Sequence, residues 1–134
     1  MKFVVDTNIL FSYFKKDSFT KKLIQNPFSE LISPSHALLE LKKYSNLIMK
    51  KCNLSKNQFE NNLKSLKKVI KFIPQKDYSK FLKEAEIISP DIKDKDFLVL
   101  CLKKEIILWS NDKLLKNQNK IKILTTEEII DLFF

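Results

Sequence analysis

Short apolar runs recur along the chain, and stretches rich in polar residues separate them. The first run, KFVVD at residues 2–6, ends on a carboxylate and then breaks into Thr7-Asn8. Runs of this length, bounded by turn-forming residues, are typical of buried strands. The pattern predicts strands at residues 2–6, 29–33, 71–74, 105–109 and 121–124.

Segments with helical spacing of apolar residues follow each of the first two runs. Residues 7–16 predict a helix, because their apolar side chains recur every three or four positions. Ser18 can cap a second short helix over residues 19–26, which Pro27 ends. A longer helix is predicted from Pro34 to residue 51. Ser33 is its candidate N-cap, since proline is favoured at the first helical position and serine just before it.

Capping signals mark further helices in the second half of the chain. Two capping boxes, Ser55–Gln58 and Thr125–Glu128, open a helix with one apolar face and the C-terminal helix, respectively. Asp77 is predicted to cap a helix over residues 78–88. Residues 97–104, FLVLCLKK, are apolar on all sides and predict a buried helix.

Strands alternate with helices throughout, and this order predicts an α/β fold with a mostly parallel five-stranded sheet covered on both faces. The sequence contains no glycine. Neither the phosphate-binding P-loop nor the GxGxxG dinucleotide-binding turn can form without glycine. The composition therefore excludes these two classes of nucleotide-binding site.

The length of 134 residues is that of one ordinary domain, so we expect residues 1–134 to form a single domain. The two cysteines, Cys52 and Cys101, make no disulfide framework, which suits a reducing compartment. The apolar run after Met1 is too short for a signal peptide, and no run approaches the ~20 residues that span a bilayer. We therefore expect a soluble cytoplasmic protein without a membrane partner.

The formal net charge is +9, and every one of the 25 basic residues is lysine. An excess of positive charge suggests a polyanionic partner such as RNA or DNA, or an acidic membrane surface. A lysine-rich composition that serves only solubility explains the charge equally well. Without arginine, the chain cannot form bidentate contacts with phosphate or guanine, so its attraction to nucleic acid should be sequence-independent and sensitive to salt.

Four acidic residues are predicted to lie near the carboxyl end of the sheet, where open parallel α/β sheets bind ligands. Asp6 ends the first strand, and Asp112 follows the fourth. Asp96 opens the buried helix that leads into the fourth strand. Glu40 lies in the helix that leaves the second strand, six residues and about 9 Å past Pro34, and is therefore not explained by the helix dipole.

Each acid also has a purely structural explanation. The three aspartates could cap helices, and Glu40 could pair with Lys42 or Lys43. Taken together, however, four acids at one edge repel one another unless a cation neutralises them, so without metal at least one should have a raised pKa. Oxygen ligands select Mg²⁺ or Mn²⁺, with Ca²⁺ possible. The single histidine, His36, is better explained as a surface residue than as a zinc ligand.

Four segments in this order resemble the PIN-domain family, which includes the VapC-type toxin ribonucleases. They are VVDTNIL at Asp6, SPSHALLELKKY at Glu40, DIKDKDFLVLCL at Asp96 and LWSNDKLL at Asp112. The resemblance implies a three-layer α/β/α domain and an Mg²⁺- or Mn²⁺-dependent endoribonuclease that hydrolyses RNA. It assigns catalysis and metal binding to those four acids.

The resemblance also implies supporting residues and partners. Asn8 and Ser110 match the motif positions that steady the first and last acids, and Asp94 is a further supporting candidate in the acidic loop before Asp96. Many members of the family form homodimers, so we expect a homodimer. The toxins of the family are silenced by an antitoxin protein, and the resemblance leaves open whether this chain is such a toxin.

Two other classes of function remain open from the sequence. The first is a non-catalytic module of the same fold that binds RNA or a protein, with its acids neutralised by lysine or kept as helix caps. The more distant one is a phosphatase or a receiver-like domain. A receiver would place a lysine after a late strand, whereas Lys113 directly follows Asp112.

Overall fold

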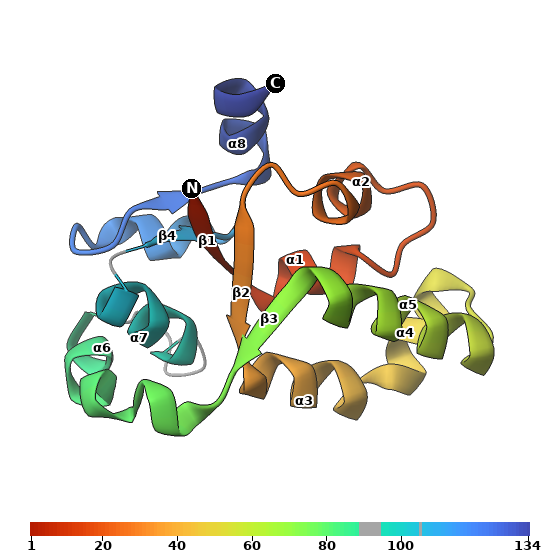
Figure 1. Ribbon diagram of the computed structural model, residues 1–134, viewed down its shortest axis with the longest axis horizontal. Helices are drawn as coiled ribbons and strands as arrows, with labels where there is room; N and C mark the ends of the chain where they lie inside the picture. Colours follow the sequence, from red (N-terminus) through yellow and green to blue (C-terminus); the bar gives the residue numbers. More distant parts are fainter. Residues whose placement is uncertain (89–94, 105) are drawn as a thin grey trace.

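The computed structural model describes residues 1–88, 95–104 and 106–134. At its centre is a five-stranded sheet in the order β3-β2-β1-β4-β5, in which every neighbouring pair is parallel (Figure 1). The strands are β1 (Lys2–Val5), β2 (Glu30–Pro34), β3 (Ile70–Ile73), β4 (Ile107–Trp109) and β5 (Ile123–Leu124). All five predicted strands are present, with ends that differ from the predicted ones by one or two residues. Residue 105, the first of the predicted strand 105–109, lies outside the described residues.

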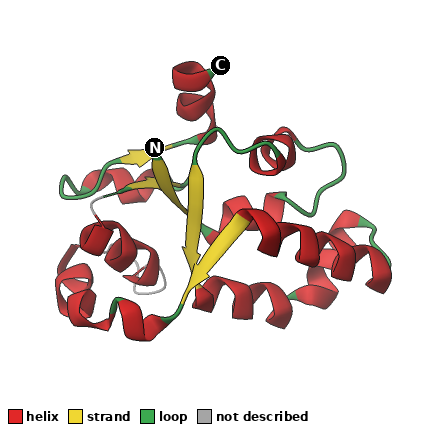
Figure 2. Ribbon diagram, viewed as in Figure 1, coloured by secondary structure: helices red, strands yellow, loops and turns green. Residues whose placement is uncertain are grey.

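Helices connect most of the strands (Figure 2). In chain order they are α1 (Thr7–Ser12) and α2 (Phe19–Gln25) before β2; α3 (Ser35–Lys43), α4 (Ser45–Cys52) and α5 (Lys56–Val69) before β3; α6 (Leu82–Ile88) and α7 (Lys95–Lys104) before β4; and α8 (Thr126–Phe133) after β5. A short 3₁₀ helix, Lys113–Asn117, links β4 to β5. Both predicted capping boxes form, at the starts of α5 and α8.

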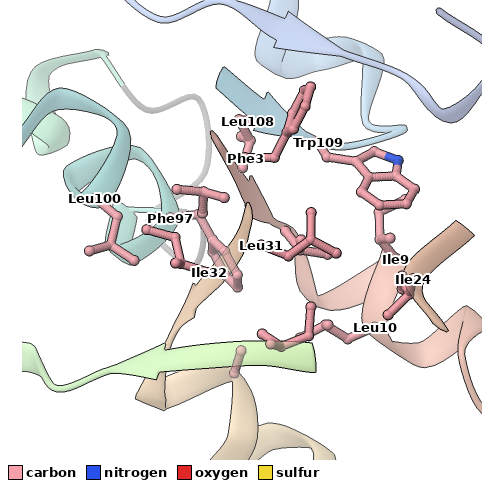
Figure 3. Packing of buried hydrophobic residues seen from close by; sticks show 14 of the residues in the cluster. Phe3, Ile9, Leu10, Ile24, Leu31, Ile32, Phe97, Leu100, Leu108 and Trp109 are labelled. Atoms are coloured by element: carbon pink, nitrogen blue, oxygen red, sulfur yellow. The ribbon is translucent and has the colours of Figure 1, made fainter. Parts of the chain in front are cut away.

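The helices form layers on the two faces of the sheet, as expected for an α/β/α fold. Helices α6 and α7 lie on one face, and α1, α2 and α5 lie on the other (Figure 1). The side chains of β2 alternate between these layers: Leu31 faces the α1 side, and Ile32 faces Phe97 and Leu100 of α7 (Figure 3). The interior of α7 is buried, from Asp96 to Cys101. No helix in the described part of the chain is long and apolar enough to cross a membrane.

The predicted helix from Pro34 to residue 51 is divided in two. Tyr44, with φ −97° and ψ 18°, lies between α3 and α4. The hydrogen-bond ladder nevertheless continues through it, because Tyr44 N–H donates to the carbonyl of Glu40 (2.9 Å) and the carbonyl of Tyr44 accepts from Ile48 N–H (3.0 Å). The prediction was therefore wrong about one uninterrupted helix but right about the helical path.

Two predicted caps are wrong. Ser33 belongs to β2, where it is fully buried and its hydroxyl donates to the Val5 carbonyl at 2.8 Å; Pro34 takes the N-cap position of α3. Asp77 ends a 3₁₀ helix, Gln75–Asp77, instead of capping α6. In both cases a polar residue suited to a helix cap takes a different place, because the sheet or a short 3₁₀ turn extends further than the pattern indicates.

Candidate active site

The site is built where β1 and β4 end side by side. In the parallel register of these strands Val5 pairs with Trp109. The next residue, Asp6, donates its backbone N–H to the Trp109 carbonyl at 3.1 Å. The buried hydroxyl of Ser110 donates to Asp6 Oδ2 at 2.6 Å. The sheet thus joins residues 104 positions apart in the sequence.

Asp112 is attached to the same point. Its backbone N–H donates to Ser110 Oγ at 3.1 Å, so one serine contacts both acids. Asp112 Oδ1 also accepts from Leu114 N–H at 3.0 Å and caps the following 3₁₀ helix. One oxygen of Asp112 therefore serves as a helix cap, as the alternative explanation expects. Asp6 occupies the N-cap position of α1, but its side chain does not cap that helix.

Glu40 reaches this end of the sheet from α3. Its carboxylate is 29% exposed, and Oε1 accepts a long hydrogen bond from the hydroxyl of Thr7, at 3.5 Å. His36, one turn earlier on α3, places Nε2 3.4 Å from the same oxygen. Thr7 is the first residue of α1 and directly follows Asp6. Glu40 is therefore tied to the residue next to Asp6, and the lysines expected beside it are not its contacts within the described residues.

The electrostatics of Asp6 show that three acids share one environment. Its side chain is only 5% exposed. Burial raises the pKa of Asp6 above its usual value, the hydrogen bonds from Ser110 and from the Thr7 backbone oppose this shift, and the negative charges of Asp112 and Glu40 add to it. The direction agrees with the expectation of a raised pKa, but its main cause is burial, and repulsion between the acids contributes less.

Asp96 lies in a different part of the site. It is in the first turn of α7 and 8% exposed, and its Oδ1 has no hydrogen-bond partner among the described residues. The hydroxyl of Tyr78, a residue only 1% exposed, is likewise without a partner there. Burial raises the pKa of Tyr78, and so do the charge of Asp96 and the closeness of its carboxylate to the Tyr78 hydroxyl. A buried carboxylate oxygen without a hydrogen bond is costly, and either the Tyr78 hydroxyl or a bound ion would relieve that cost.

The acids do not form a closed metal cage. Within residues 1–88, 95–104 and 106–134, no three histidine, cysteine, aspartate or glutamate side chains lie close enough together to hold one ion. Asn8 is exposed on α1, and its backbone carbonyl accepts from the Ser12 hydroxyl at 3.2 Å. Asp94 lies outside the described residues. The structure places Asp6, Glu40 and Asp112 near the same end of the sheet, where the charges of Asp112 and Glu40 act on Asp6, and it places Asp96 beside Tyr78.

Sequence reasoning missed three side chains that contact the acids: Thr7, His36 and Tyr78. Thr7 was visible only as part of the DTN stretch, and nothing in the pattern indicated that its hydroxyl would face α3. His36 precedes Glu40 by four residues, the spacing at which helical side chains meet, so this contact could have been predicted. Tyr78 carried no signal, because its neighbour Asp96 is distant in sequence.

Comparison with known proteins agrees with this geometry. The sequence matches the model of the PIN domain over residues 4–131. Among solved structures, the fold is similar to VapBC2 from Rickettsia felis bound to a DNA fragment from their promoter, with a TM-score of 0.63 and 19% sequence identity, over 93% of this chain and 98% of that chain. Comparison with curated proteins finds no match. Because the domain model spans nearly all of the sequence, the chain belongs to the PIN-domain family.

Proposed function

We propose that this protein is an endoribonuclease that requires Mg²⁺ or Mn²⁺, with Asp6, Glu40, Asp96 and Asp112 as its catalytic and metal-binding residues. The observation that carries the proposal is that Ser110 binds both the carboxylate of Asp6 and the backbone N–H of Asp112 at the carboxyl end of the sheet. Glu40 adds its charge to the same environment. Membership of the PIN-domain family supports a nuclease over other hydrolases.

The donor set fits a hard divalent ion. Every candidate ligand is a carboxylate, which Mg²⁺ and Mn²⁺ prefer over the softer ligands that zinc takes. The buried Asp96 Oδ1, unpartnered among the described residues, and the burial of Asp6 both favour a cation nearby. The absence of a three-residue cage among the described side chains is compatible with Mg²⁺, which often takes one or two carboxylates and keeps several waters.

When bound, the ion would lower the pKa of an attacking water and stabilise the charge on the phosphodiester. The residues of the chain would supply orientation. Ser110 holds Asp6 Oδ2 in place, and Thr7 with His36 holds Glu40 Oε1. Asp112 uses Oδ1 for its helix cap, so Oδ2 is the oxygen that it would offer.

The charge of the protein suits RNA as the substrate. In this proposal the four acids are a small negative region in a chain whose formal net charge is +9. Lysine side chains attract the phosphate backbone without reading its sequence, and this attraction weakens as salt rises. The target would then be selected by features other than arginine contacts to bases.

The test is cleavage of single-stranded RNA by the purified protein. Cleavage in Mg²⁺ or Mn²⁺, with loss of activity on chelation by EDTA and recovery when the metal is restored, is the expected result. RNA that is bound but left intact in both metals would instead favour a non-catalytic RNA-binding module of the same fold.

A second proposal concerns partners. The fold is similar to that of VapBC2 from Rickettsia felis. We propose that this chain, too, is the toxin of a toxin–antitoxin pair and binds an antitoxin protein. At 19% identity that likeness shows the fold alone. We also propose that the chain forms a homodimer, as the resemblance to the family implies.

A further inference from the structure

An exposed aromatic ring lies one helical turn beyond Glu40. Tyr44 is 39% exposed and lies between α3 and α4. Its backbone N–H donates to the Glu40 carbonyl at 2.9 Å, which fixes the position of Tyr44 relative to the acid. Four residues of helix correspond to about 6 Å along the axis. The ring is thus within reach of a nucleotide whose phosphate lies at Glu40.

The ring is held in place and has a cation beside it. Phe11, on α1, packs edge-to-face with Tyr44 at a centroid distance of 6.5 Å and an interplanar angle of 83°. Lys43 Nζ lies over the Tyr44 ring, 5.4 Å from its centroid. Lys42 and Lys43 are both exposed. An aromatic face next to lysines is the combination that binds single-stranded nucleic acid, because the base stacks while the cation pairs with phosphate.

We propose that Tyr44 is a stacking platform for a base of single-stranded RNA, next to the phosphate at the candidate active site. This inference rests on the proposed function, since it takes RNA to be the substrate. The stacked base replaces the ammonium of Lys43 above the ring, and Lys43 moves to the adjoining phosphate. Tyr44 is therefore a substrate-binding residue and takes no part in the hydrolysis.

Packing against Phe11 occupies one side of Tyr44 and leaves part of the ring exposed beside Lys43, where a base could stack. Exposed Leu39 and Leu47 lie nearby in the sequence and would suit a protein partner. The lysines favour RNA, because an apolar protein surface would have to bury the charges of Lys42 and Lys43.

The experiment measures RNA binding without cleavage. A short single-stranded RNA containing 2-aminopurine is titrated with protein in EDTA, and its integrity is checked on a gel. The wild-type protein should quench the 2-aminopurine fluorescence by stacking. Tyr44→Ala should weaken binding roughly 10-fold and abolish the quenching, within the range measured for the loss of one base–aromatic stack. Tyr44→Phe keeps the ring and should bind within about twofold of wild type.

Controls separate stacking from folding and from cleavage. Leu39→Ala removes a more exposed apolar side chain of α3 (62% exposed) and should leave RNA affinity unchanged. Urea unfolding of each variant checks the fold. If Tyr44→Ala binds RNA with wild-type affinity and quenching, the proposal is wrong, and this surface would instead suit a protein partner. If Tyr44→Phe loses as much affinity and quenching as Tyr44→Ala, the ring does not act by stacking. EDTA prevents metal-dependent cleavage, so this experiment tests RNA stacking on Tyr44 separately from nuclease activity. Either proposal can be wrong while the other is right.

Discussion

Asp6→Asn is expected to lower the rate of RNA cleavage in Mg²⁺ by about 100-fold or more, the size of loss seen when one electrostatic contact to the reacting group is removed. Asp6 is the most buried of the four acids and contacts Ser110 directly. Asparagine has nearly the same shape, and its oxygen can still accept from Ser110, so the substitution removes charge without removing volume. The loss should therefore report the carboxylate itself.

The matched control is Asp131→Asn. Asp131 is exposed on α8 and undergoes the same chemical change. Its variant should cleave RNA at the wild-type rate. Activity of Asp6→Asn within threefold of that control would remove Asp6 from the proposed site.

Asp6→Asn should also be more stable than wild type in EDTA at pH 7. The pKa of Asp6 is raised above its usual 3.8, mainly by burial and further by Asp112 and Glu40. The native state therefore holds this proton more tightly than the unfolded state does, and wild-type stability falls as pH rises from 3.8 through the raised pKa. Asparagine carries no charge and avoids this loss.

Urea unfolding at several pH values measures this difference. The stability advantage of Asp6→Asn should vanish at pH values below 3.8, where Asp6 is protonated in both states of the wild type. Lost activity together with gained stability would identify a residue kept for function at a cost in stability. A variant less stable than wild type at pH 7 would instead indicate a structural carboxylate.

Trp109→Ala is expected to lower the free energy of unfolding by about 3–5 kcal/mol, as for other large aromatic residues truncated in a core. Trp109 is fully buried at the end of β4, and its indole N–H donates to Thr126 Oγ1 on α8 at 3.0 Å. Its ring packs against Phe28, with centroids 6.1 Å apart. Since domains of this kind have total stabilities of about 5–15 kcal/mol, the variant should be near the limit of folding.

Trp109→Phe is the matched control, because it keeps an aromatic ring and loses the indole hydrogen bond and some volume. It should lose clearly less stability than Trp109→Ala in the same urea titration. Ile87→Ala, at an 84% exposed position, should be within about 0.5 kcal/mol of wild type. A loss below about 1 kcal/mol in Trp109→Ala would contradict the packing described for β4 and α8.

The sequence predicted the sheet well because each strand is apolar and separated from the next by clear helix signals. The two capping boxes were also predictable, since they depend on neighbouring residues alone. The interruption at Tyr44 was not, because no proline or glycine marks it in the sequence. The place of Ser33 was not predictable either. Its hydroxyl donates to the Val5 carbonyl of the neighbouring strand, and the sequence does not show that these two strands pair.

The site was predictable to the extent that strand ends define it. Asp6 and Asp112 follow adjacent strands, and the rule that ligands bind at the carboxyl ends of a parallel sheet brought them together. The surroundings of Asp96 were not predictable, because Tyr78 reaches it from another part of the chain. Nor could the sequence indicate that three of the four acids share one environment while Asp96 contacts a buried tyrosine.

The central claim is that these acids hold a divalent ion, and anomalous diffraction from a crystal soaked in Mn²⁺ tests it most directly. The account predicts an anomalous peak at the carboxyl ends of β1 and β4, next to the carboxylate of Asp6. The same crystal form of Asp6→Asn should lose or weaken that peak. Full soaking with no manganese at Asp6, or with manganese only elsewhere on the protein, would contradict the account.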